Sequence, residues 1–436
     1  MYKISSFDSN CSVYKNFIEY NNANSKIISS KPIPRGAGLS PRLLSASDNY
    51  QSIIITDKLS NHNFDFDLLK KTVSVNANYT FAEINKAAFS FGLELPVIGY
   101  SSIQIGAGIA SCIHGKNHYL YDFGHKVISI ELLLFSNEII FCSDEENSEI
   151  FDLTIGGYGS TGLILSAKLE LKEISSTTTM RQRYWVNNFE DSISHFNTKN
   201  VFDYTGVFGW HNLHCNKKST FGRGFVYKDT SFDKELFMPE NYPNKPAHQY
   251  NPSSLYIPGK FIFGKFFNHF YEFKEKKNST ISKFNNYSEA ISSKNIYWSI
   301  MRVNGFIEVQ FIVPYSNIQD FIIFLEKLIK KFNAKTSVCI TKPACGEKKF
   351  LRFRNDGLNI DITGIKNSIN IKFFHEINKC AKSFNAIPNI SKCSILSIDV
   401  IKECYGNEFE SFHSTYEKSL NSKPPEWFLK NGLINF

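Results

Sequence analysis

Three glycine-rich segments near the start of the chain place the strongest constraint on what it can fold into. They are residues 34–40 (PRGAGLS), a segment around Gly106-Ala107-Gly108, and residues 156–162 (GGYGSTG). Glycine lets a backbone come close to a ligand, and the N–H groups of such a turn can converge on an anion. Each segment alone is explained equally well as a tight turn or loop. Three of them within one β-rich stretch favour a site for a long dinucleotide that lies across strand ends.

Neither of the common glycine-rich nucleotide motifs is present. No Gly-Lys-Ser/Thr follows residues 34–40, so this segment is not a P-loop. The Gly106-Ala107-Gly108 turn lacks the third glycine and the downstream ribose-binding acid of a Rossmann βαβ unit. The expected dinucleotide site is therefore of another type.

The hydrophobic pattern predicts an α+β fold of more than one unit. A chain of 436 residues exceeds one core of usual size. Residues 31–174 indicate mainly strands and turns, with a hairpin around Ser136-Asn137 and clear one-face alternation over residues 163–172. Thr80 and Glu83 have the spacing of a helix capping box.

The C-terminal part has a different order of elements. From residue 305 the pattern predicts strand, helix, strand, strand and helix, which indicates a split βαβ, ferredoxin-like layer. We expect three segments along the chain, the last of which returns to the first. Their predicted bounds are 1–174, 175–385 and 386–436.

Composition excludes several classes of protein. The net charge of +8 is scattered along the chain, and nothing resembles a nucleic-acid-binding motif, so no nucleic-acid partner is expected. The nine cysteines form no CxxC pair, which predicts reduced thiols in a cytoplasmic protein. His211 and His214 lack a second ligand cluster, so no metal is expected. We find no signal peptide and no apolar window long enough to span a membrane.

Three motifs in a fixed order resemble a known family. Arg-Gly-x-Gly-x-Ser at 35–40, Ile-His-Gly-Lys-Asn-His at 113–118 and Gly-Gly-x-Gly-x-Thr-Gly at 156–162 are similar to the FAD-binding domain of vanillyl-alcohol-oxidase-type (PCMH-type) flavoproteins. The nearest group is the decaprenylphosphoryl-β-D-ribose 2′-oxidases, and the aldonolactone oxidases are more distant. The resemblance runs from about residue 30 to 420. It implies a two-lobed FAD-binding domain and an α+β substrate or cap domain, with FAD between them.

The resemblance also implies which residues bind the cofactor. Those around the FAD pyrophosphate are Arg35, Gly36, Ala37, Gly38, Leu39 and Ser40. Those that line the flavin are Gly99, Tyr100, Gln104, Gly106, Ala107, Ser111, Ile113 and His114. Those near the adenosine half are Gly159, Gly162 and Ile164. Asn389 stands where the family has a cofactor-contacting Tyr. The sequence around His114 resembles the group with non-covalent FAD, although a covalent link through this histidine is the alternative.

A second set of residues is implied for the substrate. The substrate-binding positions are Lys116, Gln310, Lys342, Asn359 and Asp361. The catalytic candidates are Lys392 and His114, because a buried lysine can have a lowered pKa and act as a base, or can stabilise an alkoxide. Asp361 replaces a Cys, Leu358 a Trp and Asn389 a Tyr of the related mycobacterial enzymes. These departures bear on the substrate more than on the flavin.

The implied activity is oxidation of a secondary hydroxyl of a sugar to a ketone by hydride transfer to flavin N5. The sugar would be linked to a polyprenyl phosphate or a nucleotide. By analogy, the reaction would be half of an epimerisation in cell-envelope polysaccharide biosynthesis, completed by a nicotinamide-dependent reductase. The alternatives are an aldonolactone oxidase and a non-catalytic flavoprotein subunit.

Residues 260–277 interleave phenylalanines with lysines. This pattern predicts either a cap-domain element whose aromatic residues fill its own core, or a lid that touches a membrane. The second interpretation predicts a peripheral protein at the inner face of the cell membrane.

Overall fold

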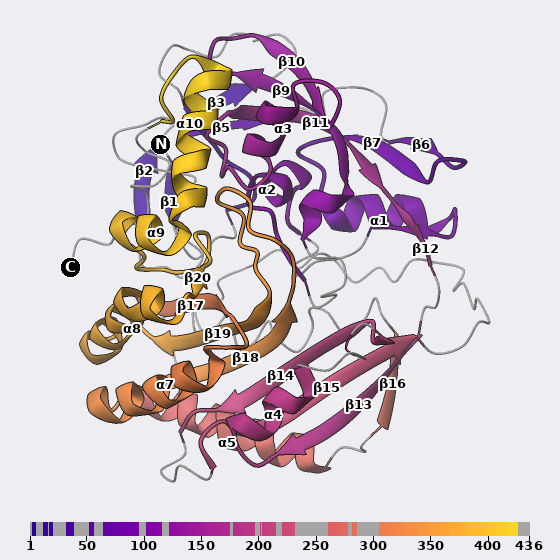
Figure 1. Cartoon of the computed structure of the whole chain (residues 1–436). Helices are drawn as coiled ribbons and strands as arrows, with labels where there is room; N and C mark the ends of the chain where they lie inside the picture. Colours follow the sequence, from indigo (N-terminus) through magenta and orange to yellow (C-terminus); the bar gives the residue numbers. More distant parts are fainter. Residues whose placement is uncertain are drawn as a thin grey trace.

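Figure 1 shows the computed structural model, in which two mixed layers are stacked with the C-terminal helices along one side. The structure describes part of the chain. The described residues are 2–5, 12–15, 17–20, 32–38, 52–55, 64–95, 102–115, 122–174, 178–196, 201, 203–214, 220–231, 260–277, 281–285 and 305–425. Helices and sheets are both present, so the predicted α+β class is confirmed.

The N-terminal layer is built on a five-stranded antiparallel sheet with the order β10-β9-β11-β7-β6. Its strands are β6 (Asp65–Asp67), β7 (Thr72–Asn76), β9 (Val127–Leu134), β10 (Ile139–Ser143) and β11 (Gly162–Glu170). Strands β9 and β10 form the hairpin predicted around Ser136-Asn137. Strand β11 is the predicted alternating strand, and it lies in the centre of the sheet because it pairs with both β9 and β7.

Three helices accompany this sheet. They are α1 (Phe81–Phe89), α2 (Ile105–Ala110) and α3 (Ser148–Thr154). Thr80 and Glu83 form the predicted capping box, with both reciprocal hydrogen bonds present. The apolar faces of α1 and α2 join the inner face of the sheet in one hydrophobic core.

Short strands complete the N-terminal layer. Strands β3 (Phe17–Tyr20), β5 (Ser52–Ile55) and β4 (Ile33–Pro34) form a parallel three-stranded sheet. Strand β1 (Tyr2–Ser5) pairs with β2 (Ser12–Lys15), and β8 (Leu93–Glu94) pairs with β12 (Lys172–Glu173). A 3-10 turn, η2 (Phe123–Lys126), leads into β9.

The second layer is an eight-stranded sheet with the order β16-β13-β15-β14-β18-β19-β17-β20. Its strands are β13 (Thr178–Val186), β14 (Gly206–Asn212), β15 (Arg223–Ser231), β16 (Ile281–Asn285), β17 (Phe306–Val313), β18 (Thr336–Ala344), β19 (Gly357–Ile365) and β20 (Ile387–Pro388). Helix α7 (Ile318–Phe332) follows β17, and α8 (Ser368–Cys380) follows β19. The neighbour order β18-β19-β17-β20 is that of a split βαβ layer, as the sequence predicted.

The two faces of this sheet differ in what covers them. On one face, Val309, Phe311 and Ile360 pack with α7, α8 and α4 (Phe189–Phe196) in the larger hydrophobic core. Because side chains alternate along a strand, the residues between them point to the other face. At one end of that face, α5 (Lys260–Lys277) packs on the sheet, with Tyr271 against Trp210 at 4.6 Å.

Buried carboxylates hold helix α5 in place. Glu272 accepts from Arg223 and Asn212, and Glu275 accepts from Arg183 and Tyr227. Phe270 and Phe273 are 53% and 58% exposed, so these two phenylalanines do not fill a core as one interpretation predicted. In the described part of the chain, no helix has the length and apolar character needed to cross a membrane.

The C-terminal helices return to the N-terminal layer. Helices α9 (Ile398–Tyr405) and α10 (Asn407–Leu420) follow β20, and α10 lies against α3 (Figure 1). The Tyr416 hydroxyl donates to the Ser160 carbonyl at 2.8 Å. The third glycine segment is thus held by a residue near the end of the chain.

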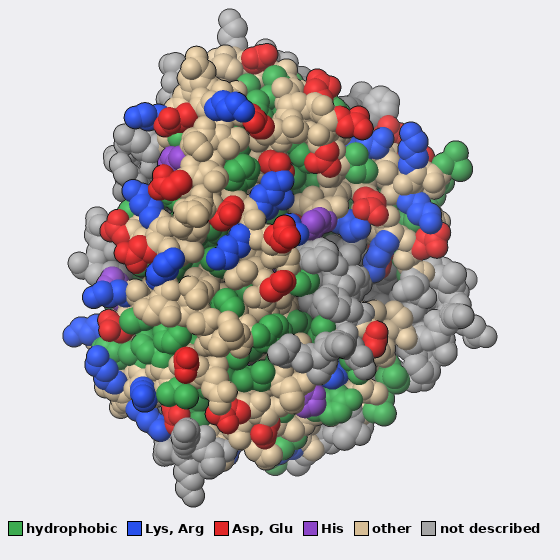
Figure 2. Space-filling model, in the orientation of Figure 1, with side chains coloured by type: hydrophobic (Ala, Val, Ile, Leu, Met, Phe, Trp, Pro, Cys, Tyr) green, Lys and Arg blue, Asp and Glu red, His purple; other side chains and the backbone are tan. Residues whose placement is uncertain are grey.

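Figure 2 shows acidic and basic side chains interspersed across this face of the molecule. Among the described residues of this face, basic side chains occur over both layers and not in one area alone.

Candidate active site

The three glycine segments lie together in the N-terminal layer. A Cβ atom on Gly36 would lie 2.7 Å from the Cβ of Ala107 and 3.2 Å from Oε1 of Gln104. Gly159 has a φ of +83°, and a Cβ there would lie 3.2 Å from the ring of Pro34. These approaches need glycine, because a side chain would meet the neighbouring segment. The first segment is therefore packed between the second and the third.

Backbone hydrogen bonds fix the third segment on helix α2. The N–H of Gly156 donates to the Ile109 carbonyl at 3.0 Å, and the N–H of Tyr158 donates to the Ala110 carbonyl at 2.8 Å. Gly162 begins β11 with a φ of +152°, which favours glycine, and a Cβ there would lie 2.2 Å from the Leu133 carbonyl oxygen; Ile164 is 5% exposed in the hydrophobic core. Backbone conformation and packing account for a glycine at position 162 and an isoleucine at position 164 without a ligand. The contacts predicted between these residues and the adenosine half of FAD stay a prediction.

Several predicted cofactor residues have defined positions. Arg35 is half-buried beside Gly38, and burial lowers the pKa of its guanidinium below the ordinary value. Ser111 and Ile113 follow α2 and lead to His114 at the edge of the second layer. The predicted site residues that lie outside the described residues are Leu39, Ser40, Gly99, Tyr100 and Lys116.

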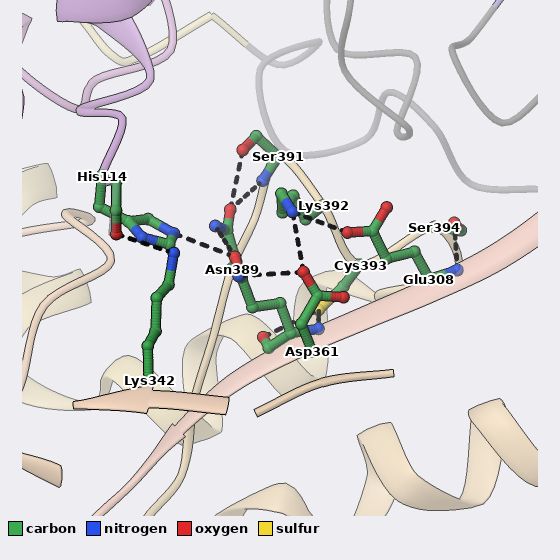
Figure 3. A network of polar contacts seen from close by, with 11 residues as sticks. His114, Glu308, Lys342, Asp361, Asn389, Ser391, Lys392, Cys393 and Ser394 are labelled. Carbon is green, nitrogen blue, oxygen red and sulfur yellow. Dashed lines mark hydrogen bonds and ion pairs between the residues drawn. The ribbon is translucent and has the colours of Figure 1, made fainter. Parts of the chain in front are cut away.

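Strand register brings the predicted substrate residues of the second layer together. Gln310 on β17 is the cross-strand partner of Asp361 on β19, and Lys342 on β18 is the partner of Asn359 on β19. All four side chains lie on the face opposite α7 and α8. This face is turned toward His114, which comes from the glycine-rich layer (Figure 3).

A chain of hydrogen bonds links the two layers at this point. The His114 ring Nε2 lies 3.2 Å from Oε1 of Gln310, and the Asn389 amide donates to the same oxygen at 2.6 Å. The Gln310 amide then donates to Oδ2 of Asp361 at 3.3 Å. Since Gln310 is 1% exposed and bonded on both sides, its side chain is held in one orientation.

Lys392 lies between two carboxylates. Its ammonium donates to Oε1 of Glu308 at 2.8 Å and to Oδ2 of Asp361 at 2.9 Å (Figure 3). Burial alone would lower the pKa of Lys392, but the charges of Asp361 and Glu308 outweigh it and raise the pKa above the ordinary value. Of the two roles considered for Lys392, a base with a lowered pKa does not fit these contacts, whereas a cation that stabilises an alkoxide does. Lys392 is a cation at neutral pH.

His114 has the opposite tendency. Burial and the nearby charges of Lys342 and Lys392 lower its pKa well below the ordinary value, so the ring is neutral. Its ring also packs on Phe353, with centroids 5.2 Å apart. A neutral imidazole in this position can exchange hydrogen bonds with a hydroxyl without adding charge.

A pocket opens beside His114 and Lys342. Its empty volume is about 330 Å³, part of which is open to solvent, and it is also lined by Cys345, Phe353 and Arg354. The Lys342 ammonium donates to the Gly115 carbonyl at 3.0 Å. Asn359 is 2% exposed, and its Oδ1 has no hydrogen-bond partner among the residues that the structure describes. A buried amide oxygen of this kind is ready to accept from a ligand.

Four residues of the candidate site were not predicted from the sequence: Glu308, Cys345, Phe353 and Arg354. Glu308 could have been found, because it is two residues from Gln310 on the same strand and so shares its face. The other three follow β18 in an irregular segment, where no periodicity fixes the direction of a side chain.

The two histidines considered for a metal make other contacts. The ring of His211 bonds to the Gly222 carbonyl and to the Thr341 hydroxyl, whereas His214 bonds to the Thr336 carbonyl. Among the described residues, no group of three or more potential ligands could hold a metal ion.

Comparison with known proteins places these features among oxidases. The chain is 27% identical to decaprenylphosphoryl-β-D-ribose oxidase from Mycolicibacterium smegmatis over 302 residues, which are 66% of this chain and 65% of that protein. The chain is similar to sugar and lactone oxidases. L-Gulonolactone oxidase from Scyliorhinus torazame is 26% identical over 31% of this chain and 30% of its own length. D-Arabinono-1,4-lactone oxidase from Yarrowia lipolytica is 30% identical over 22% of this chain and 19% of its own.

These matches confirm the resemblance predicted from the three motifs. They also support the predicted class, an FAD-dependent oxidoreductase. The chain spans less than two thirds of the length of each of these relatives. No family model matches the chain.

Proposed function

We propose that the chain is an FAD-dependent oxidoreductase that oxidises a secondary hydroxyl of a sugar to a ketone. The observation that carries this proposal is the polar cluster of Gln310, Asp361 and Lys392, which faces His114 from the glycine-rich layer. Such a cluster can orient a polyhydroxylated substrate through directed hydrogen bonds. The similarity to oxidases of a lipid-linked sugar and of aldonolactones supports the same class of substrate.

The residues present fit a bound FAD. Gly36 and Gly159 let the three glycine segments pack together without intervening side chains, so that backbone is exposed to a ligand there, and Arg35 supplies a cation beside them. We propose that residues 1–174 and 386–436 form the two-lobed PCMH-type FAD-binding domain, with residues 175–385 as the substrate or cap domain. When bound, FAD would accept a hydride at flavin N5. Non-covalent binding remains our proposal.

The remaining chemistry belongs to side chains of this chain. Lys392 presents a permanent cation to the oxygen that loses its proton, which stabilises an alkoxide. Gln310 and Asn389 hold each other in place and keep the His114 ring oriented. Asn359 and Lys342 would bind the part of the substrate that lies in the adjoining pocket. Lys116 stays a proposed substrate residue on the basis of the sequence motif.

Two substrate classes fit this proposal. A polyprenyl-phosphate sugar is favoured by the similarity to decaprenylphosphoryl-β-D-ribose oxidase, and a nucleotide sugar is the soluble counterpart. The ketone product would then be consumed by a nicotinamide-dependent reductase, which would complete an epimerisation in envelope polysaccharide synthesis. An aldonolactone oxidase is the second candidate, because two of the relatives have lactone substrates in their names.

Anaerobic titration of the purified flavoprotein tests the proposal. A phosphorylated pentose derivative should bleach the flavin absorbance, whereas an aldonolactone should do so only under the second candidate. A flavin that no sugar or lactone reduces would instead identify a non-catalytic flavoprotein.

A further inference from the structure

The Glu308–Lys392–Asp361 cluster contains two carboxylates for one ammonium. The carboxylates come from neighbouring strands, Glu308 from β17 and Asp361 from β19, and both contact the same Nζ atom within 2.9 Å. A single lysine can neutralise only one of them. Two carboxylates held this close ionise as a pair, and the pair binds one proton more readily than an isolated carboxylate.

Among the described residues, no cation other than Lys392 forms an ion pair with either carboxylate. The neutral His114 lies beyond Gln310, and the Lys342 ammonium is bonded to the Gly115 carbonyl. The thiols of Cys339 and Cys393 are buried, and the negative charge of Asp361 adds to burial in raising the pKa of Cys339. Lys392 is therefore the principal counter-ion of both carboxylates.

Burial separates the roles of the two acids. The Glu308 side chain is 3% exposed, whereas the Asp361 and Lys392 side chains retain 16% and 35% exposure. A substrate hydroxyl that enters the cluster therefore meets Asp361 and Lys392 before Glu308. Burial and the charge of Asp361 raise the pKa of Glu308 to about 8, although Lys392 opposes this shift. This value lies close to neutral pH, where a general base works best.

We propose that the Glu308–Asp361 pair, and not Lys392, is the proton acceptor for the hydroxyl that is oxidised. The inference rests on the proposed function and assigns the base within that site. The substrate O–H bond breaks, and its proton goes to the pair through Asp361. The C–H bond breaks, and its hydride would pass to FAD, which supplies the oxidant when bound. The electron pair of the O–H bond completes the new C=O bond, and Lys392 stabilises the oxygen as it loses the proton.

The sign of the pH dependence follows from this assignment. The pair accepts the substrate proton only when both carboxylates are ionised, so the rate of flavin reduction should rise with pH and level off above about 8. Glu308→Gln removes the carboxyl group whose pKa is raised and leaves Asp361 alone beside Lys392. This variant should reduce flavin roughly 100-fold more slowly at high pH and lose the rise. Lys392→Met should shift the rise to higher pH, because the cation that favours the ionised pair is gone.

The protonation of the Glu308–Asp361 pair can be measured directly in the absence of substrate. Infrared difference spectra of the wild-type holoenzyme, titrated without substrate, should show the carbonyl band of a protonated carboxylic acid that disappears as the pH rises through about 8. Glu308→Gln and Asp361→Asn should each abolish this titration. Glu272→Gln is the matched control, since Glu272 is a buried glutamate paired with Arg223 and lies outside the cluster. That variant should keep the band.

Each outcome decides between the assignments. The assignment of the pair as proton acceptor is overturned if the titrating band survives in both cluster variants. It is also overturned if the wild-type protein has no carboxylic acid that titrates near neutral pH. A pH profile that Lys392→Met abolishes rather than shifts would make Lys392 the base. If Glu308→Gln fails to fold, the infrared titrations of the wild-type protein and of Asp361→Asn still test whether the pair is the proton acceptor. The proposed function fails separately, when no sugar or lactone reduces the flavin although the band titrates.

Discussion

Gln310 and Asp361 face each other across strands β17 and β19, and the Gln310 amide donates to Oδ2 of Asp361 at 3.3 Å. The same glutamine accepts from Asn389 and lies 3.2 Å from the His114 ring, so one side chain joins the glycine-rich layer to the acidic cluster. Asp361 is therefore held from both sides, by Gln310 and by Lys392. The proposed cofactor site and the proposed substrate site are thus connected by hydrogen bonds through Gln310.

The first prediction concerns flavin content and the glycine segments. The purified protein should be yellow and should release FAD into the supernatant on acid precipitation. Gly36→Val should lose most of the flavin, because the added side chain meets Ala107 at a distance shorter than a normal contact. Gly92→Val is a control for a solvent-facing glycine, since nothing lies within 4 Å of a Cβ there. Its positive φ costs stability but should leave flavin content unchanged. Wild-type protein that binds no flavin even with excess FAD would contradict the proposed function.

The second prediction concerns Lys392. Lys392→Ala should keep FAD and lose turnover by roughly 100-fold or more, because the cation that stabilises the alkoxide is removed. The variant should also lose stability, since Glu308 and Asp361 are left close together without their counter-ion. Lys418→Ala is the control, because Lys418 forms an exposed ion pair with Glu149. Turnover of the Lys392 variant at the wild-type rate would show that this lysine does not act on the substrate.

The third prediction concerns the choice of substrate. Asp361→Cys should change the relative kcat/KM among sugars without a loss of flavin, because a charged hydrogen-bond acceptor at the substrate is replaced by a weak one. Steady-state kinetics with a panel of sugars and lactones measures this. An unchanged ranking of substrates would show that Asp361 does not contact the varied part of the sugar.

The fourth prediction concerns helix α5 and a membrane surface. Phe270 and Phe273 are exposed, and Lys274 lies beside them in the sequence. If the substrate is lipid-linked, the protein should sediment with anionic liposomes at low salt and detach at high salt, since each lysine near such a surface contributes about 1 kcal/mol. Phe270→Ser with Phe273→Ser should weaken sedimentation, whereas Phe141→Ser, an exposed phenylalanine of the other layer, should not. Protein that stays in the supernatant at low salt favours a soluble sugar substrate.

Local sequence signals predicted much of the fold. The Thr80–Glu83 capping box, the β9–β10 hairpin and the alternating strand β11 depend on residues close in the chain, and each is present. The order of elements after residue 305 also held, because turn residues separate strongly periodic segments. The predicted segment bounds at 174 and 385 stay predictions.

The protonation of the site could not be predicted in the same way. Lys392 meets Glu308, 84 residues earlier in the chain, through a register that only the folded sheet defines. The sequence pointed to Lys392 and Asp361 separately but not to their contact or to Glu308, so it could not decide whether the pKa of the lysine is lowered or raised. Positions were predictable from pattern, whereas charge states depended on contacts between distant strands.

The hydrogen bond from Tyr416 to the Ser160 carbonyl has a consequence for synthesis of the chain. The two residues are 256 positions apart, and Tyr416 lies on the last helix that the structure describes. While the ribosome is still adding the intervening residues, the third glycine segment lacks this contact. The third glycine segment therefore gains this contact only after α10 has been synthesised, and if the proposed FAD site needs it, the cofactor would bind late in the synthesis of the chain.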